Sequence, residues 1–216
     1  MSPRGPGART DRAPVCLNAI SAAGGEELDL VRRGVRGFGV ACAADLATAL
    51  HRLAAREARH AGPPPVRALD LIGHAAGDHR LLELGGWRLG PDAGTAAAFA
   101  ALAPVLRALG VGHVRLLGCA TATTEAGLRT MARLHAALQA GARAGPPIQV
   151  WGSRALLGPH CYGRLGLLPR HHALLRPYPA AAAPGRSLTA PAPPAPGSAR
   201  PARTAGPRPG ADSRWP

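Results

Sequence analysis

Two short segments of the chain end in a side chain that could do chemistry: residues 71–74 (LIGH) end in His74, and residues 116–119 (LLGC) end in Cys119. Both follow one plan, in which an apolar run leads to a glycine and then to the reactive residue. A cysteine acts as a nucleophile when a nearby histidine assists the proton transfers. We therefore interpret His74 and Cys119 as a candidate catalytic pair, distant in the sequence and adjacent in the fold.

The elements that would position this pair are two buried strands. The apolar runs 68–72 and 114–117 have the length and character of strands covered on both faces, as the strands of a parallel sheet are. Ligands of such sheets bind where loops leave the carboxyl ends of the strands. The sequence therefore predicts both reactive side chains at that edge of one sheet.

The rest of the chain alternates between predicted strands and helices. Further strands are expected at residues 15–20, 38–41 and 148–151, a hairpin at 81–89, and helices that begin at Glu26 and Asp45 or span 95–109 and 128–138. This alternation implies parallel strands joined by right-handed crossovers, and it predicts an α/β fold, a three-layer α/β/α sandwich with a mainly parallel sheet.

Two local features refine these helices. Pro104 is expected to kink or divide the helix 95–109, because proline lacks the N–H that a helix interior needs. One of Thr121, Thr123 and Thr124 is expected to cap the helix that follows Cys119, whose dipole would then favour the thiolate.

The length of 216 residues fits one domain with a full core, which we assign to residues 13–176. Residues 1–12 and the Pro-, Ala- and Arg-rich residues 177–216 show no periodicity, and we expect both segments to be disordered. The apolar stretch 165–175 has no assigned structure.

Arginine supplies all of the basic charge: the chain has 26 Arg and no Lys against 12 acidic residues, a net charge of +14. A basic surface favours the binding of phosphates. No stretch between residues 13 and 176 has a basic helix face with interleaved aromatic residues, and only 3% of the chain is aromatic. A nucleic-acid binder is therefore an alternative that we do not expect, and a solvated basic surface explains the charge.

The four cysteines form no CxxC pair and no secreted disulfide framework. The first twelve residues lack the apolar core of a signal peptide, and no run of about 18 apolar residues predicts a membrane span. We therefore expect reduced thiols in a cytoplasmic protein with no membrane contact. The histidines and cysteines show no zinc-site spacing, so neither a metal nor another cofactor is expected.

With both strand ends identified, residues 15–163 resemble the caspase-hemoglobinase fold of the clan CD cysteine peptidases, which include caspases, gingipains and bacterial CHAT domains. The shared pattern is an apolar strand that ends in a histidine and, one helix later, an apolar strand that ends in a cysteine. In this chain these are residues 70–74 and 115–119. The predicted hairpin after His74 is similar to one that the bacterial relatives carry.

The resemblance implies a thiol protease, a hydrolase that cleaves peptide bonds without a cofactor. Cys119 would attack the peptide carbonyl and His74 would assist proton transfer to the leaving amine. The backbone N–H groups of Ala75 and Cys119 would form the oxyanion hole, and Ser153 and Arg154 would line part of the specificity pocket. The partners implied are a peptide or protein substrate and a regulatory protein.

One position departs from the family, which has glycine after the histidine where this chain has Ala75. Alanine keeps the N–H, but it is strained by about 1 kcal/mol if the position needs a positive φ angle. The alternative interpretation is a catalytically inactive scaffold of the same fold, acting as a protein-interaction module with the Arg- and Pro-rich tail as a tether. A cysteine at a strand end is otherwise an ordinary small buried residue.

Overall fold

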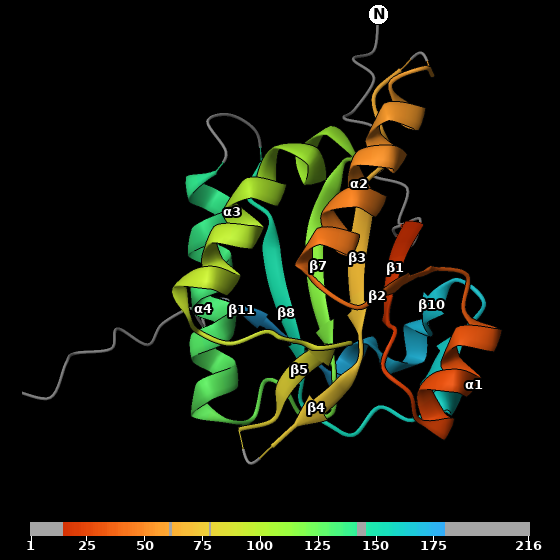
Figure 1. The fold of residues 1–216 in the computed structure, drawn as a ribbon, viewed down its shortest axis with the longest axis vertical. Coiled ribbons are helices and arrows are strands. Elements are labelled where there is room, and N and C mark those ends of the chain that lie inside the picture. Colours follow the sequence, from red (N-terminus) through yellow and green to blue (C-terminus); the bar gives the residue numbers. More distant parts are fainter. Residues whose placement is uncertain (1–14, 61, 78, 142–145, 180–216) are drawn as a thin grey trace, which may run out of the picture. The chain divides into compact units, whose positions relative to one another are not determined.

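A six-stranded, mainly parallel sheet is the centre of the structure (Figure 1). Across the sheet its strands are β11 (Leu175–Tyr178), β8 (Gln149–Ser153), β7 (Val111–Leu117), β3 (Arg67–Ile72), β1 (Val15–Ser21) and β2 (Phe38–Val40). β11 pairs antiparallel with β8, and all other neighbours are parallel. The structure is a computed structural model that describes residues 15–60, 62–77, 79–141 and 146–179.

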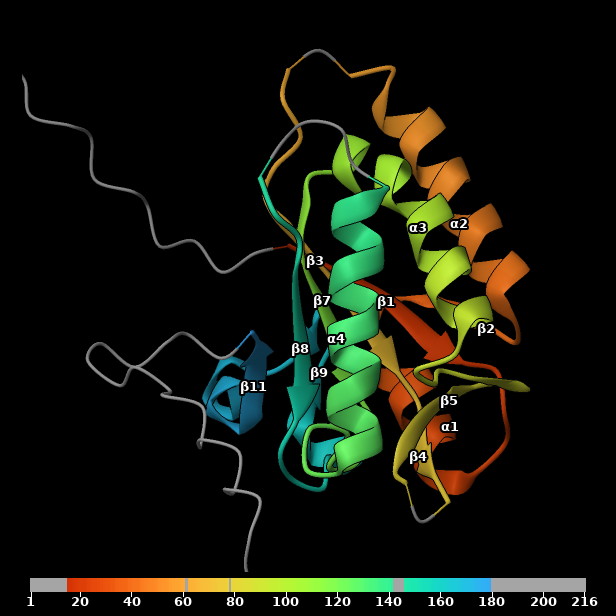
Figure 2. The same cartoon turned by 90° about the vertical axis from the view of Figure 1, so that its left-hand side faces the viewer.

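Three helices lie together on one side of this sheet (Figure 2). They are α2 (Ala43–Glu57), α3 (Ala93–Ala108) and α4 (Glu125–Ala140). Their apolar residues recur at helical spacing and form one large core with the strand residues that face them. This core includes Phe99 of α3, Leu71 of β3 and Leu116 of β7. The burial of these side chains holds the helices against the sheet.

The opposite face of the sheet is covered by different elements. A smaller apolar cluster joins Ile72 and Leu117 of the sheet to Leu28 and Val31 of α1 (Glu26–Gly34). The chain after β8 completes this cover with η1 (Pro159–Cys161), β9 (Tyr162–Gly163), β10 (Gly166–Leu167) and η2 (Pro169–Leu174). The predicted α/β class and the mainly parallel sheet are thus confirmed.

A separate three-stranded antiparallel sheet lies at the carboxyl ends of β3 and β7 (Figure 1). It consists of β4 (His74–Ala76), β5 (Leu81–Leu84) and β6 (Trp87–Arg88). The predicted hairpin corresponds to β5 and β6, whereas β4 was not predicted. Alanine has low strand propensity, so these residues are a strand only because they pair with β5.

Two boundaries differ from the predictions. Helix α3 continues through Pro104, whose side chain is exposed while its neighbours Ala103 and Val105 pack in the core. The packing of these neighbours holds one helix together despite the missing N–H. Pro177 and Tyr178, assigned to the tail, belong to β11, where they pair with Trp151 and Val150. The predicted disordered segments 1–12 and 180–216 lie outside the described residues.

Candidate active site

The register of the two central strands brings His74 and Cys119 to the same level. In the pair β3–β7, Ile72 lies opposite Leu117, and each reactive residue follows its strand by two positions. Both side chains are half-buried and line one pocket. The structure thus brings together the two residues that the sequence had separated by 45 positions (119 − 74).

This pocket is small and covered. Its other lining residues are Glu27, Leu28, Val31, Ile72, Gly73, Leu157, Pro159 and Tyr162, and its volume is about 20 Å³. A space of that size holds one water molecule. The Tyr162 hydroxyl donates to the carbonyl of Leu117 at 3.4 Å, and burial raises the pKa of this phenol. Tyr162 is therefore a neutral side chain that anchors the covering segment to β7.

Strand β5 explains why a glycine precedes each reactive residue. A β-carbon at Gly73 would lie 2.1 Å from the carbonyl oxygen of Glu83, and one at Gly118 would lie 2.8 Å from Cδ1 of Leu82. Neither position has room for a side chain. The repeated glycine thus lets β5 contact the ends of both strands at once.

The backbone groups predicted to form an oxyanion hole are near each other. The β-carbon position of Gly118 is 3.5 Å from the backbone nitrogen of Ala75, so this N–H lies beside the residue that precedes Cys119. Ala75 is part of β4 and its φ angle is not positive. The alanine at this position therefore carries none of the strain considered above.

The strained residue follows the cysteine instead. Ala120 has a φ of 56°, a left-handed conformation that costs a residue with a β-carbon about 1–2 kcal/mol. Its N–H donates to the carbonyl of Ala155 at 2.9 Å, and its carbonyl accepts from the N–H and hydroxyl of Thr123 at 3.1 and 2.7 Å. Such strain persists where surrounding bonds fix the conformation, and here they fix the turn that carries Cys119.

The helix after Cys119 is capped by one of the three threonines expected to do so. Thr124 is the N-cap of α4, and its hydroxyl accepts from the N–H of Gly127 at 3.1 Å and donates to the carbonyl of His79 at 2.7 Å. Five residues, 120–124, lie between Cys119 and the start of α4 at Glu125. Cys119 is therefore not part of the first turn of α4, where the helix dipole acts, and an effect of this helix on the thiol stays a prediction.

Gly25 is a residue of this site that the sequence analysis did not single out. It has a φ of 139°, and a β-carbon there would lie 3.0 Å from Nε2 of His74. The backbone at the start of α1 thus lies against the imidazole. The signal in the sequence was the pair Gly24-Gly25 shortly after the first strand, immediately before α1.

Ser153 and Arg154 have other contacts. The Ser153 hydroxyl donates to the carbonyl of Ala155 at 2.7 Å, and its backbone N–H donates to the hydroxyl of Thr121 at 3.0 Å. Arg154 is exposed. Within the described part of the chain, neither residue lines the pocket of His74 and Cys119. Ser153 supports the turn after Cys119, since Ala155 also accepts from Ala120.

A buried ion pair joins the two strands that carry the reactive residues. Arg115 of β7 donates to both carboxylate oxygens of Asp70 in β3, at 2.5 and 2.7 Å. The guanidinium also contacts Sγ of Cys16 at 3.0 Å and Nε2 of His172 at 3.2 Å. Burial raises the pKa of Asp70, and the adjacent guanidinium opposes that rise. Because arginine keeps its charge, we treat the pair as ionic.

The structure therefore defines an α/β protein with a mainly parallel sheet and a histidine–cysteine pair at its carboxyl edge. Comparison of the chain with models of protein families, with curated proteins and with solved structures finds no match in any of the three. Among the described residues, no helix has the length and apolar character to cross a membrane. The same residues contain no cluster of three or more His, Cys, Asp or Glu side chains that could hold a metal ion.

Proposed function

We propose that this chain is a cysteine peptidase of the caspase-hemoglobinase type, with Cys119 as the nucleophile and His74 as the general acid and base. The observation that carries the proposal is the shared pocket of these two residues at the carboxyl edge of β3 and β7. The mainly parallel sheet supports it, since sites of such sheets lie at this edge. A three-layer sandwich, a cytoplasmic location and a regulatory protein partner belong to the same proposal.

In the first half of the reaction, His74 takes the proton of the Cys119 thiol, and the sulfur attacks the carbonyl carbon of the substrate. The oxyanion that forms lies near the N–H groups of Ala75 and Cys119. Each donor of this kind lowers the free energy of the transition state by about 3 kcal/mol. The carbon–nitrogen bond then breaks, and His74 gives a proton to the leaving amine. The product of this half is a thioester between the acyl group and Cys119.

In the second half, water attacks the thioester carbonyl while His74 accepts a proton from it. The carbon–sulfur bond breaks, His74 returns the proton to the sulfur, the carboxylic acid leaves and both residues are restored. A pocket of about 20 Å³ admits water but not a peptide. Leu157 and Pro159 line this pocket and limit its size.

The proposal is tested by covalent labelling of the full chain with peptidyl acyloxymethyl ketones, mapped by mass spectrometry. We expect labelling at Cys119, its loss in Cys119→Ala, and a rate about a hundredfold lower in His74→Ala. Cys42 is an exposed free thiol, so Cys42→Ala is the matched control and should leave labelling unchanged. Labelling that survives Cys119→Ala, or a His74→Ala rate equal to that of the unmodified protein, would refute the proposal.

The small volume of the pocket favours a second candidate, a catalytically inactive scaffold that binds other proteins through this fold. This candidate predicts that Cys119 reacts with the probe no faster than Cys42. It also predicts that His74→Ala has no effect on that rate. The labelling rates of the two thiols in one sample therefore decide between the candidates.

A further inference from the structure

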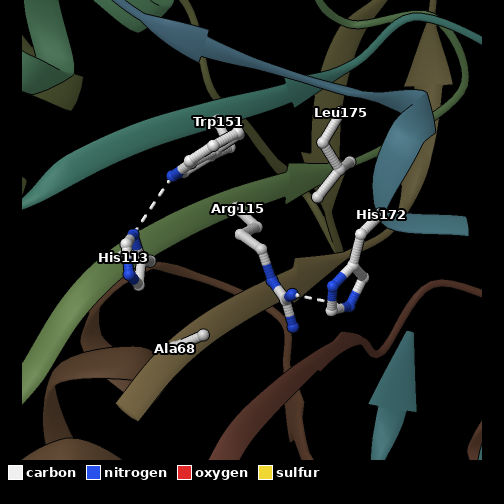
Figure 3. Close-up of a pocket in the computed structure, with 6 residues that line it drawn as sticks. All are labelled: Ala68, His113, Arg115, Trp151, His172 and Leu175. Carbon is white, nitrogen blue, oxygen red and sulfur yellow. Dashed lines mark hydrogen bonds between the residues drawn. The ribbon is translucent and has the colours of Figure 1, made fainter. Parts of the chain in front are cut away.

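A second pocket lies on the sheet face opposite to α2, α3 and α4, away from the reactive pair. It is lined by Ala68, His113, Arg115, Trp151, His172 and Leu175 (Figure 3). None of these residues lines the pocket of His74 and Cys119. Its volume of about 140 Å³ is close to that of the cavities of about 150 Å³ that bind benzene in proteins, so it has room for one six-membered ring.

The walls of this pocket are of two kinds. Trp151, Leu175 and Ala68 present apolar surface, which suits a planar ring. The polar groups are the guanidinium of Arg115 and the imidazoles of His113 and His172 on either side of it (Figure 3). A ligand with an apolar body and one polar end fits this division.

The hydrogen bonds show that the polar wall offers donors. The indole N–H of Trp151 donates to Nδ1 of His113 at 3.2 Å, so the proton of the neutral imidazole is on Nε2. Arg115 donates from Nη1 to His172, and Nη1 carries a second N–H. A ligand oxygen could therefore accept hydrogen bonds from the Nε2–H of His113 and from the second Nη1–H of Arg115.

The charges around the pocket favour an anion. Burial is the main cause that lowers the pKa of both His113 and His172, and the positive charge of Arg115 lowers it further. The groups that face Arg115 are these two imidazoles, the thiol of Cys16 from β1 and the carboxylate of Asp70 from β3. Asp70 is fully buried beneath the guanidinium.

We propose that this pocket binds a small aromatic monocarboxylate, with its ring against Trp151 and Leu175 and its carboxylate on Arg115 and His113. This site is independent of the peptidase proposal, because it uses none of the residues of the reactive pair. Nε and Nη2 of Arg115 are bonded to Asp70, so its contact with the carboxylate is a single hydrogen bond from Nη1, while the tryptophan ring suits an aromatic body.

Calorimetric titration of the full chain with benzoate tests the proposal. We expect saturable binding of one benzoate per chain, with the carboxylate accepting hydrogen bonds from Arg115 and His113. The uncharged analogue benzamide should bind about tenfold or more weakly. No saturable benzoate binding at about 10 mM, or benzamide binding as tight as that of benzoate, would overturn the proposal.

Two variants locate the site. Ala68→Val adds two methyl groups to the pocket wall and should remove benzoate binding. His113→Leu removes one donor and should weaken binding about tenfold, while the matched variant His51→Leu on exposed α2 surface should not. Melting temperatures show whether each variant is folded. If Ala68→Val fails to fold, the benzoate affinity of His113→Leu still tests the site, because His113 is half-buried and more tolerant of substitution. An unchanged affinity in folded His113→Leu would refute the site.

Discussion

Asp70 and Arg115 are cross-strand partners, and each lies four residues before a member of the His74–Cys119 pair. The bidentate ion pair is nearly inaccessible to solvent, with side chains 0% and 5% exposed. A shift of β3 against β7 would separate the two charges in the protein interior, where an unpaired charge is costly. The ion pair therefore holds the register that brings the imidazole and the thiol to one level.

The first prediction concerns this ion pair. Arg115→Leu should lower the free energy of unfolding by about 3–5 kcal/mol, because it leaves a buried carboxylate without its partner. The double variant Asp70→Leu/Arg115→Leu should recover much of that loss, since no charge is left to bury. Urea unfolding of the single and double variants measures both values. Equal losses of unfolding free energy in the single and double variants would show that the unpaired carboxylate of Asp70 is not what destabilises Arg115→Leu.

Gly25 gives the second prediction. Gly25→Ala should displace the imidazole of His74, because its β-carbon would lie 3.0 Å from Nε2 at a φ of 139°. We expect the labelling rate of Cys119 to fall at least about tenfold, since small displacements of catalytic groups have large effects. Gly24 has no heavy atom within 4 Å of its β-carbon position, so Gly24→Ala is the matched control. Equal labelling rates in Gly25→Ala and Gly24→Ala would show that the backbone at Gly25 does not position the imidazole of His74.

The third prediction concerns the cover of the reactive pair. Leu157 lines the small pocket, and Leu157→Ala should widen it and raise the rate at which Cys119 reacts with a peptidyl probe. The neighbouring Leu156 is 69% exposed and does not line this pocket, so Leu156→Ala tests the effect of truncation alone. Rates from time courses of labelling provide the comparison. A slower reaction in Leu157→Ala would show that this side chain binds the probe rather than excludes it.

The fourth prediction concerns how the free energy of unfolding depends on pH. Burial lowers the pKa values of His113 and His172 below their usual 6.5, so the unfolded chain takes up protons before the folded one does. The two imidazoles should therefore make the free energy of unfolding decrease as the pH falls from about 7.5 through 6.5 to about 5.5. His113→Leu should reduce this slope, and the exposed control His51→Leu should not reduce it by this mechanism. Urea unfolding over this range tests the sign, and an unchanged slope in folded His113→Leu would refute it.

Much of the fold could be predicted because its signals are local. The buried strands around Leu71 and Leu116 are continuous apolar runs, and the helices show apolar residues at helical spacing. β4 and β11 carry no such signal: His74–Ala76 is a strand only through pairing with β5, and Pro177 is placed in β11 by its pairing with Trp151. Long-range pairing of this kind overrides local propensity.

By itself the sequence determined which residues could do chemistry and at which strand ends they lie, because residue type and apolar pattern are properties of the chain. Only the tertiary structure decided that His74 and Cys119 share one pocket, that Tyr162 helps to cover it, and that the backbone strain is at Ala120 rather than Ala75. These features depend on strand register and on contacts between distant segments. The physical reason is that packing, and not local preference, fixes how such segments meet.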